Sequence, residues 1–168
     1  MSKSIKSISS YIIVILAALL IKQFVFSPIR VNGTSMYPTL HDGDFMILNE
    51  AGFYIKGLKR FDIVVVKIDG ERLIKRVIGM PGDKVKYYEN KLYINDEEIK
   101  EEFEHDVTHN FELLEIGYDT VPEGFYFVVG DNRGNSNDSR KFGLVRESQI
   151  KGKARLIIFP FSRMGIVK

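Results

Sequence analysis

Residues 61–78 read FDIVVVKIDGERLIKRVI, and their composition points to β structure. Two runs rich in β-branched residues, 61–68 and 72–78, flank an Asp-Gly pair, which is a common turn signal between strands. A long apolar period of 3.6 residues, which would indicate an amphipathic helix, is missing here and everywhere after residue 28. We therefore expect two strands joined by a turn, in a domain that is mostly β.

The rest of the chain after residue 28 has the same sequence pattern, in which short expected strands are separated by turn residues. Glu89 and Asn90 separate two such runs and predict a hairpin. Strands are expected at residues 45–49, 85–88, 91–94, 111–116, 125–129 and 155–159. A chain of 168 residues with 45% hydrophobic and 27% charged residues suits one globular core, so we expect one folded domain and no disorder.

The N-terminal segment differs from the rest because it is almost wholly apolar. Lys3 and Lys6 precede an apolar stretch over residues 8–26. A helix of that length would be about 28 Å long, close to the thickness of a hydrocarbon core. Pro28 then ends the helix. We therefore expect a retained transmembrane anchor at residues 8–27, preceded by a tail at residues 1–7.

Two other interpretations of this segment are a cleaved signal peptide and a buried soluble helix. The basic start suits a signal peptide, but the apolar run is followed by KQFVF (22–26), which contains no small-x-small cleavage site. Lys22 lies where its ammonium can extend to a membrane interface. Lysines or arginines lie on both sides of the segment, so the positive-inside rule gives almost no indication of its orientation in the membrane.

The charge balance and the lack of cysteine exclude several classes of function. The net charge is +2, and residues 1–26 contribute three lysines and no acid, so the remaining chain is near neutral. A near-neutral body without a basic run argues against electrostatic binding of nucleic acid. The absence of cysteine excludes disulfides, thiolate nucleophiles, iron–sulfur clusters and cysteine zinc sites, and we expect no cofactor.

The three histidines form no recognisable catalytic or metal-binding pattern. His105 and His109 are four residues apart, in or beside the acid-rich stretch 96–106, but no helix is expected there and no Glu stands in the HExxH position. A solvated loop is the favoured interpretation, and no metal site is expected. His41 lies in a turn-like His-Asp-Gly-Asp sequence and is expected at the surface.

Three other segments carry residue types that can perform chemistry. Ser35 lies in NGTSMYPTL (32–40), which is also an ordinary turn sequence. Lys75 shares a strand face with Leu73 and Val77, and it is either an exposed edge lysine or a desolvated amine. The loop GDNRGNSNDSR (130–140) is either a flexible surface loop or a compact loop that supports a site. Residue spacing alone leaves these alternatives open.

Together, SMYPTL (35–40), KRVIGMPGD (75–83) and the loop 130–140 resemble the motif boxes of bacterial type I signal peptidases. Their order, their spacing and the preceding apolar segment agree with that family, so the resemblance covers nearly the whole chain. The short form with one anchor is similar to the Gram-positive members. It implies a complex β fold of the LexA and signal-peptidase type, with residues 84–125 as a smaller inserted β region.

The resemblance implies a membrane-bound Ser/Lys endopeptidase that removes signal peptides from exported preproteins. Ser35 would attack the carbonyl at the cleavage site. Lys75 would be the general base, which requires burial to lower its pKa from about 10.4 to about 8. Ser136 would orient the lysine by a hydrogen bond, and Asp138 would brace the loop together with Arg140.

The oxyanion hole is less complete in the sequence. The backbone N–H of Ser35 would serve as one donor. Some family members have a serine two residues before the nucleophile, and its hydroxyl helps to stabilise the oxyanion. Here that position is Gly33, so a second donor near Gly33 stays open.

On the substrate side, the family recognises small residues at the first and third positions before the cut. The residues that match its shallow apolar pockets are Ile29, Val31, Met36, Leu40 and Ile74, although a plain core would also use them. Asp62, Ile63 and Val64 are candidates for pairing with an extended substrate as an added strand.

The resemblance also implies where the chain lies in the cell. Residues 1–7 would be cytoplasmic, and residues 28–168 would lie outside the cell membrane, in contact with phospholipid. The partners would be secretory preproteins, with no nucleic acid, and the oligomeric state is left open.

Two rival functions are considered beside this one. A LexA-type self-cleaving regulator shares the Ser/Lys β fold, but it needs a DNA-binding helix-turn-helix where residues 1–28 form a hydrophobic span. A membrane-anchored homologue that has lost catalysis is disfavoured because both Ser35 and Lys75 are present.

Overall fold

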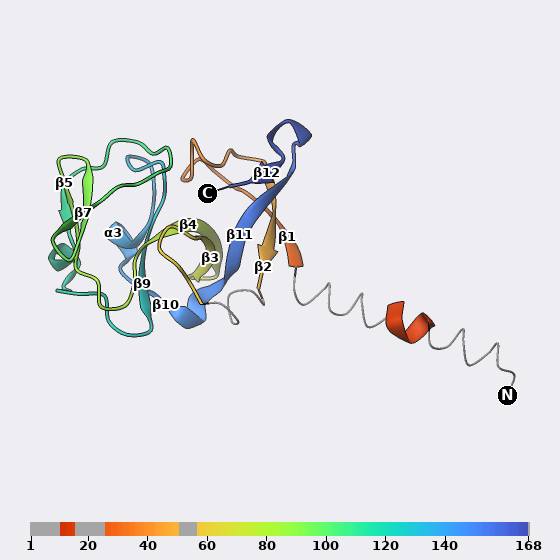
Figure 1. Ribbon diagram of the computed structural model, residues 1–168, viewed down its shortest axis with the longest axis horizontal. Helices are drawn as coiled ribbons and strands as arrows, with labels where there is room; N and C mark the ends of the chain where they lie inside the picture. The colour runs from red at the N-terminus through yellow and green to blue at the C-terminus, as the bar shows by residue number, and fades with distance from the viewer. Residues whose placement is uncertain (1–10, 16–25, 51–56, 168) are drawn as a thin grey trace, which may run out of the picture.

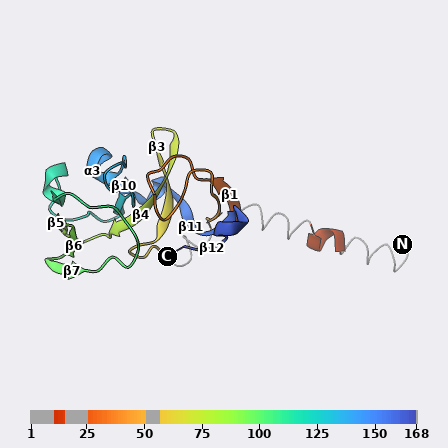
Figure 2. The ribbon, with the colours of Figure 1, turned by 90° about the horizontal axis from the view of Figure 1, so that it is seen from above.

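The computed structural model describes residues 11–15, 26–50 and 57–167, and its domain is built from two antiparallel sheets (Figure 1). The larger sheet has the strand order β1-β2-β11-β3-β4-β9-β10, with β12 paired to β11. The smaller sheet has the order β7-β6-β5-β8. It lies at the end of the domain opposite to β1, as two views show (Figure 1 and Figure 2).

The elements are mostly short strands. The larger sheet contains β1 (Phe26–Arg30), β2 (Phe45–Asn49), β3 (Ile63–Ile68), β4 (Glu71–Gly79), β9 (Phe125–Val129), β10 (Val145–Arg146), β11 (Ile150–Phe159) and β12 (Gly165–Ile166). The smaller sheet contains β5 (Val85–Tyr88), β6 (Lys91–Ile94), β7 (Glu97–Ile99) and β8 (Phe111–Glu112). The short helices are η1 (Leu113–Ile116), α3 (Ser139–Phe142), η2 (Glu147–Gln149) and η3 (Phe161–Arg163).

The prediction of a mostly β domain is confirmed, and most expected strands lie within two residues of the observed ones. The stretch 111–116 is an exception, because β8 ends at Glu112 and η1 follows. There the N–H of Glu112 donates to Glu115 Oε1 at 2.8 Å, which favours a helical turn over a longer strand. β11 begins at Ile150, before the expected start at residue 155, because its first residues pair with β3.

The expected anchor at residues 8–27 is wrong in its C-terminal bound, because β1 begins before residue 27. Phe26 and Ser27 are the first residues of β1 and pair with β2, so a helix cannot include them. The rest of the expected anchor lies mostly outside the described residues, apart from the helical residues 11–15. Within the described ranges, no helix combines the length and the apolar character that a membrane span needs.

β3 lies in the middle of the larger sheet and is buried on both faces. Val64 and Val66 belong to one apolar cluster, and Ile63 and Val65 belong to another. Burial of each such side chain stabilises the fold by about 1.5–3 kcal/mol relative to exposure, which is why residues 63–66 are an unbroken apolar run. Lys75 of β4 pairs with Val64, so the fold places this lysine against a buried strand.

Candidate active site

Ser35 and Lys75 meet although they are far apart in the chain. Ser35 lies in a turn after β1, and Lys75 lies in the middle of β4. Lys75 Nζ is 2.7 Å from Ser35 Oγ, which is hydrogen-bonding distance. Ser35 is half-buried, whereas only 2% of Lys75 is exposed. The geometry therefore joins a hydroxyl that a substrate can reach to an amine that is shielded from water.

The surroundings of Lys75 lower the pKa of its amine to about 8. Burial is the largest cause, because removing an ammonium from water disfavours its charged form. Asp138 and Asp131 oppose this shift in pKa by favouring positive charge, and Arg140 adds to it. Near neutral pH a usable fraction of the amine is then uncharged and able to accept a proton.

The loop after β9 holds the turn that carries Ser35. Asn132 N donates to Ser35 O at 3.1 Å, and Asn132 Nδ2 donates to Thr34 O at 3.0 Å. Asn135 Nδ2 donates to Thr34 Oγ1 at 3.3 Å. These bonds fix the backbone of the turn, and so they set the position of the Ser35 hydroxyl.

Gly130 allows this loop to approach the Ser35 turn closely. A Cβ atom at this position would overlap both Ser35 O and Ser136 Oγ. Only glycine, which has no Cβ, fits here. The Gly130 N–H donates to Asp138 Oδ2 at 3.1 Å, which ties the start of the loop to its far end.

Asp138 and Arg140 form a buried ion pair at that far end. Arg140 Nε donates to Asp138 Oδ1 at 2.9 Å, and Arg140 Nη2 donates to Asp138 Oδ2 at 2.8 Å. Asp138 also caps α3 by accepting from the N–H of Arg140. Burial raises the pKa of Asp138, but the hydrogen bonds and charge of Arg140 outweigh burial and hold this pKa below its usual value. Asp138 is therefore a buried carboxylate that stays ionised.

Ser136 is buried, but the structure does not show the direct hydrogen bond to Lys75 that the resemblance implies. Ser136 Oγ makes no hydrogen bond of ordinary geometry with any described residue. The hydroxyl lies beside Gly130 and the carboxylate of Asp138, and it contributes to lowering the pKa of Asp138. Ser136 therefore borders the dyad through Asp138 and Gly130.

Of the two expected oxyanion donors, the N–H of Ser35 is free within the described part of the chain and the N–H of Gly33 is occupied. The N–H of Ser35 donates to none of the described residues, so a substrate oxygen can accept its hydrogen bond. The N–H of Gly33 donates to Asp42 Oδ1 at 2.7 Å and so cannot be the second donor. Gly33 has φ +83°, and its role is to turn the chain toward Ser35.

The comparison with known proteins agrees with this geometry. The family described as signal peptidase, peptidase S26, matches residues 4–159. The chain belongs to this family. Signal peptidase I T of Bacillus subtilis (strain 168) is 42% identical over 166 residues, which is 94% of this chain and 86% of that relative. A signal peptidase I of Bacillus amyloliquefaciens is 41% identical over 168 residues, with the same coverage.

A solved structure also resembles this signal peptidase. The crystal structure of a signal peptidase I from Enterococcus faecalis V583 has a TM-score of 0.54 and 38% sequence identity. The match covers 59% of this chain and 97% of that chain. The protein is thus a type I signal peptidase of the Gram-positive kind, a serine peptidase whose substrates are preproteins with signal peptides.

In this signal peptidase, the residues matched to substrate pockets belong to one apolar cluster. That cluster includes Ile29, Val31, Met36, Leu40 and Ile74. Met36 and Leu40 are at most 1% exposed and serve as core, whereas Ile29 and Ile74 are each 9% exposed. The latter two line a cleft of about 250 Å³ together with Pro28, Arg30, Asn32, Val65 and Arg72. This β1–β4 cleft lies between the edge strand β1 and the strand that carries Lys75.

The strand edge expected at residues 62–65 is not available to a substrate. Val64 pairs with β4 on one side and with β11 on the other, so both of its sides are used. Asp62 forms an ion pair with Lys153 at 2.6 Å. The unpaired edges beside the cleft are instead those of β1 and of β4 before Arg76, where pairing with β9 begins.

Sequence reasoning missed two buried arginines in the motif boxes. Arg76, the neighbour of Lys75, donates to Asp131 from Nε at 2.9 Å and from Nη2 at 2.6 Å, and neither side chain is exposed. Arg133 donates to Glu101 Oε1 from Nη2 at 2.6 Å. Arg76 directly precedes the apolar residues Val77 and Ile78 in β4, and an arginine in the buried part of a strand indicates an ion pair, because burial without a partner is costly.

The expectation of a solvated loop at 96–106 is wrong for Glu101. Its side chain is 4% exposed and meets Arg133, while Thr108 Oγ1 accepts a second hydrogen bond from Arg133 at 2.7 Å. His105 lies 3.4 Å from Glu101 and forms no bond with Ser35. His41 Nε2 lies 3.1 Å from an arginine of η3 and likewise does not meet the Ser35 hydroxyl.

Proposed function

We propose that this signal peptidase works through a Ser35/Lys75 dyad and cleaves preproteins after small residues at positions −3 and −1. The proposal rests on the 2.7 Å contact between the Ser35 hydroxyl and a buried amine whose pKa is about 8. Lysine is a base near neutral pH only when its surroundings remove its charge, and burial has that effect here. A catalytically inactive homologue would have no need of such a contact.

The reaction would pass through an ester on Ser35, with Lys75 carrying the proton. Neutral Lys75 accepts the hydroxyl proton while Ser35 Oγ attacks the carbonyl carbon of the scissile bond, and the Ser35 N–H stabilises the oxyanion. The intermediate collapses, Lys75 gives the proton to the leaving nitrogen, and the peptide bond breaks. Lys75 then takes a proton from water, whose oxygen attacks the ester. Ser35 regains its proton, and the signal peptide leaves with a free carboxyl group.

Asp138, Arg140 and Ser136 would support the dyad without reacting. The negative charge of Asp138 favours the ammonium that forms on Lys75 when Ser35 loses its proton. Arg140 keeps Asp138 ionised and in place through two hydrogen bonds. Ser136 lies beside Asp138 and Gly130 and excludes water from the side of the loop that faces the dyad.

An extended substrate would bind in the β1–β4 cleft as an added strand. The edge of β1 and the free part of β4 provide unpaired backbone groups for it. Ile29 and Ile74 form a shallow apolar floor, which suits small side chains at −1 and −3. Main-chain pairing together with two small-residue pockets would explain how one enzyme accepts preproteins of varied sequence.

The placement in the membrane is part of the same proposal. Residues 1–7 would be cytoplasmic, an anchor would lie within residues 8–25, and the domain would lie outside against phospholipid. Phe45, Phe159 and Phe161 support this contact because they are exposed and follow one another at centroid distances of 6.1 and 5.7 Å. Exposed aromatic and apolar side chains of this kind suit the headgroup and acyl boundary of a bilayer.

The test is preprotein cleavage by purified full-length variants. Ser35→Ala and Lys75→Ala should each lower kcat by roughly 10³-fold or more, and the double variant should lose little beyond either single one, because the two act as a unit. Lys75→Arg should be equally inactive, since a guanidinium stays protonated.

The controls are Ser162→Ala and Lys141→Arg, which change exposed residues that bond to neither member of the dyad. Both should cleave like the unmodified enzyme. Near-normal turnover by Lys75→Arg would remove lysine from the role of general base.

A further inference from the structure

Three cations around the β1–β4 cleft form no ion pair with any described residue. Arg30 and Arg72 line the cleft from its two facing strands. Lys67 pairs with Arg72 across the β3–β4 hairpin. All three side chains are exposed, and within the described ranges none of them forms a side-chain hydrogen bond. Their charge is therefore free for a ligand.

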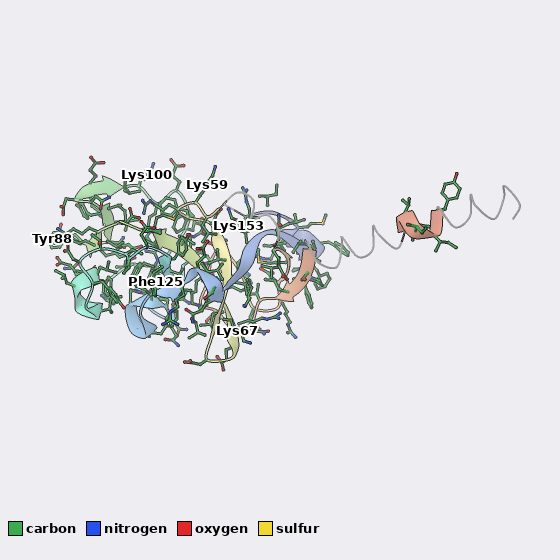
Figure 3. All side chains as sticks on the ribbon, turned by 90° about the horizontal axis from the view of Figure 1, so that it is seen from below. Lys59, Lys67, Tyr88, Lys100, Phe125 and Lys153 are labelled. Carbon is green, nitrogen blue, oxygen red and sulfur yellow. The ribbon has the colours of Figure 1, made fainter. Side chains whose placement is uncertain are left out.

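Lys67 and Arg72 lie directly opposite each other on one face of the hairpin. Like charges in this arrangement repel each other, so they weaken the sheet unless an anion lies between or beside them. The hairpin projects from the body of the domain (Figure 2), and Figure 3 shows Lys67 near its projecting end. The repulsion is thus located where another molecule can approach.

The cleft itself has the chemistry of a carboxylate site. Its lining contains two arginines and no acidic residue. A guanidinium matches a carboxylate well, because the two can form a pair of parallel hydrogen bonds. We propose that Arg72, with Arg30 on the facing strand and Lys67 beside it, selects preproteins that carry an acidic side chain shortly before the cleavage site. This inference rests on the proposed binding of the substrate in the cleft.

The spacing along β4 indicates which substrate residue is selected. Arg72 is three residues before Lys75, so it lies about 10 Å from the base along a strand that rises about 3.3 Å per residue. An extended substrate advances at the same rate, which brings its third to fifth residue before the cut beside Arg72. Position −3 is small in the proposed substrates, so the acidic side chain belongs at −4 or −5.

An anionic lipid surface is the other ligand with this charge, but the hairpin disfavours it. Asp69 and Glu71 lie at the turn and are both exposed. A negatively charged bilayer would repel these acids at the same end that would have to touch it. Arg30 and Arg72 also line the cleft with Ile29 and Ile74, where a peptide is proposed to lie. A peptide carboxylate is therefore the favoured occupant.

The experiment measures kcat/KM of the full chain in neutral detergent for matched peptides. Each peptide has Ala at −3 and −1 and carries Asp, Asn or Lys at −4 or −5. We expect the Asp peptide to be cleaved about three- to tenfold more efficiently than the Asn peptide at one of these positions, and the Lys peptide less efficiently. The preference should weaken as NaCl is added, because salt screens exposed charges.

Variants at Arg72 connect the preference to the cleft. Arg72→Gln should abolish the preference, so that this variant cleaves the Asp and Asn peptides with equal kcat/KM, and Arg72→Glu should reverse the preference in favour of Lys. Arg155→Gln is the matched control, because it removes an exposed arginine that is not part of the cleft lining. It should leave the Asp preference unchanged.

Each outcome has a definite meaning. The inference would be overturned if the unmodified enzyme showed no preference for the Asp peptide, or if Arg72→Gln kept the same preference as the unmodified enzyme. In either case, continued cleavage of the Asn peptide would leave the proposed function intact. Failure of the unmodified enzyme on every peptide would contradict the proposed function instead. Loss of binding to vesicles that contain anionic phospholipid in Arg72→Gln, with unchanged peptide preference, would assign the cations to lipid and overturn the inference.

Discussion

At the scale of single residues, Lys75 combines two properties that its position in β4 imposes. Its neighbour across the hairpin is Val64, which is fully buried, and its amine lies 2.7 Å from the Ser35 hydroxyl. A fall in its pKa from 10.5 to about 8 corresponds to about 3 kcal/mol against the charged form. That free energy destabilises the ammonium in the resting enzyme, and it leaves an amine that can take a proton near neutral pH.

The pH dependence of cleavage should report this amine. We expect kcat/KM to rise with pH, with a single apparent pKa of about 8, because the base works only when it is unprotonated. Well below that pKa, each pH unit should change the rate about tenfold, and above it the rate should level off. Initial rates on one peptide across this range provide the measurement.

The control for this profile is a variant without histidine, in which His41, His105 and His109 are each replaced by Gln. It should keep the same rise with pH, since neither His41 nor His105 bonds to Ser35. Disappearance of the rise in this variant would show that a histidine, and not Lys75, is the group that titrates.

Gly130 offers a second prediction for a single residue. Gly130→Ala should lower kcat by about 10²-fold or more, because the new methyl group would overlap Ser35 O and Ser136 Oγ and displace the nucleophile. Gly134→Ala is a matched control in the same loop, where a Cβ meets no atom within 4 Å. Cleavage assays and thermal unfolding of both variants are the measurements. Equal activity of the two would contradict the close approach at Gly130.

At the scale of elements, the segment between β7 and β8 braces the loop 130–140. Glu101 and Thr108 both accept hydrogen bonds from Arg133, and the N–H of Asp106 donates to Asp131 O at 3.0 Å. The ring of Phe103 lies 3.8 Å from the guanidinium carbon of Arg76. The loop 130–140, which holds the Ser35 turn, is therefore supported by the segment between β7 and β8, and this segment contributes no atom to the dyad.

Removing this brace should reduce stability. Glu101→Ala leaves Arg133 buried without its carboxylate and should lower the free energy of unfolding by about 3–5 kcal/mol. Glu98→Ala, which breaks an ion pair with Lys91 whose side chains are more than half exposed, should change it by less than about 1 kcal/mol. Thermal or urea unfolding measures both. Similar small losses in the two variants would mean that the Glu101 pair contributes no more than a surface pair.

Much of the sheet was predictable because local composition decides it. β-Branched runs between turn residues gave β2, β5, β6 and β9 with their observed bounds. β1 was not predictable in this way, because Phe26 belongs to the apolar stretch 8–26 and only its pairing with Asn49 makes it a strand. β8 was predicted too long. The side chain of Glu115 accepts a hydrogen bond from the N–H of Glu112, and the chain turns into η1 at this point.

The candidate site was predictable in its residue types but not in its contacts. Ser35 and Lys75 were singled out from motif boxes, yet spacing alone left the lysine either exposed or buried. The pair of Arg133 and Glu101 joins two segments with no shared pattern, so no periodicity reveals it. Val64 pairs with strands on both sides because β11 pairs with β3, and the local sequence does not indicate that pairing.

At the scale of the whole molecule, the cleft and the smaller sheet lie toward opposite ends. β1, whose residues line the cleft, is at one end of the domain, and β5 to β7 are at the other (Figure 1). The cleft begins at Pro28, only two residues beyond the apolar stretch 8–26. A domain attached through this stretch would therefore present its cleft to the membrane and its smaller sheet to the aqueous phase.

The last prediction is the side of the membrane on which the domain lies. Ser35 is nine residues beyond Phe26, so the chain can extend at most roughly 30 Å between them, and an anchor within residues 8–25 would keep Ser35 near the bilayer surface. In the proposed topology, a domain on the outer face would meet the cleavage site as the preprotein emerges from the membrane. Protease added to intact spheroplasts should then digest residues 28–168, while a cytoplasmic marker protein stays whole. Digestion only after the membrane is broken would place the domain in the cytoplasm, where Ser35 could not meet an exported substrate.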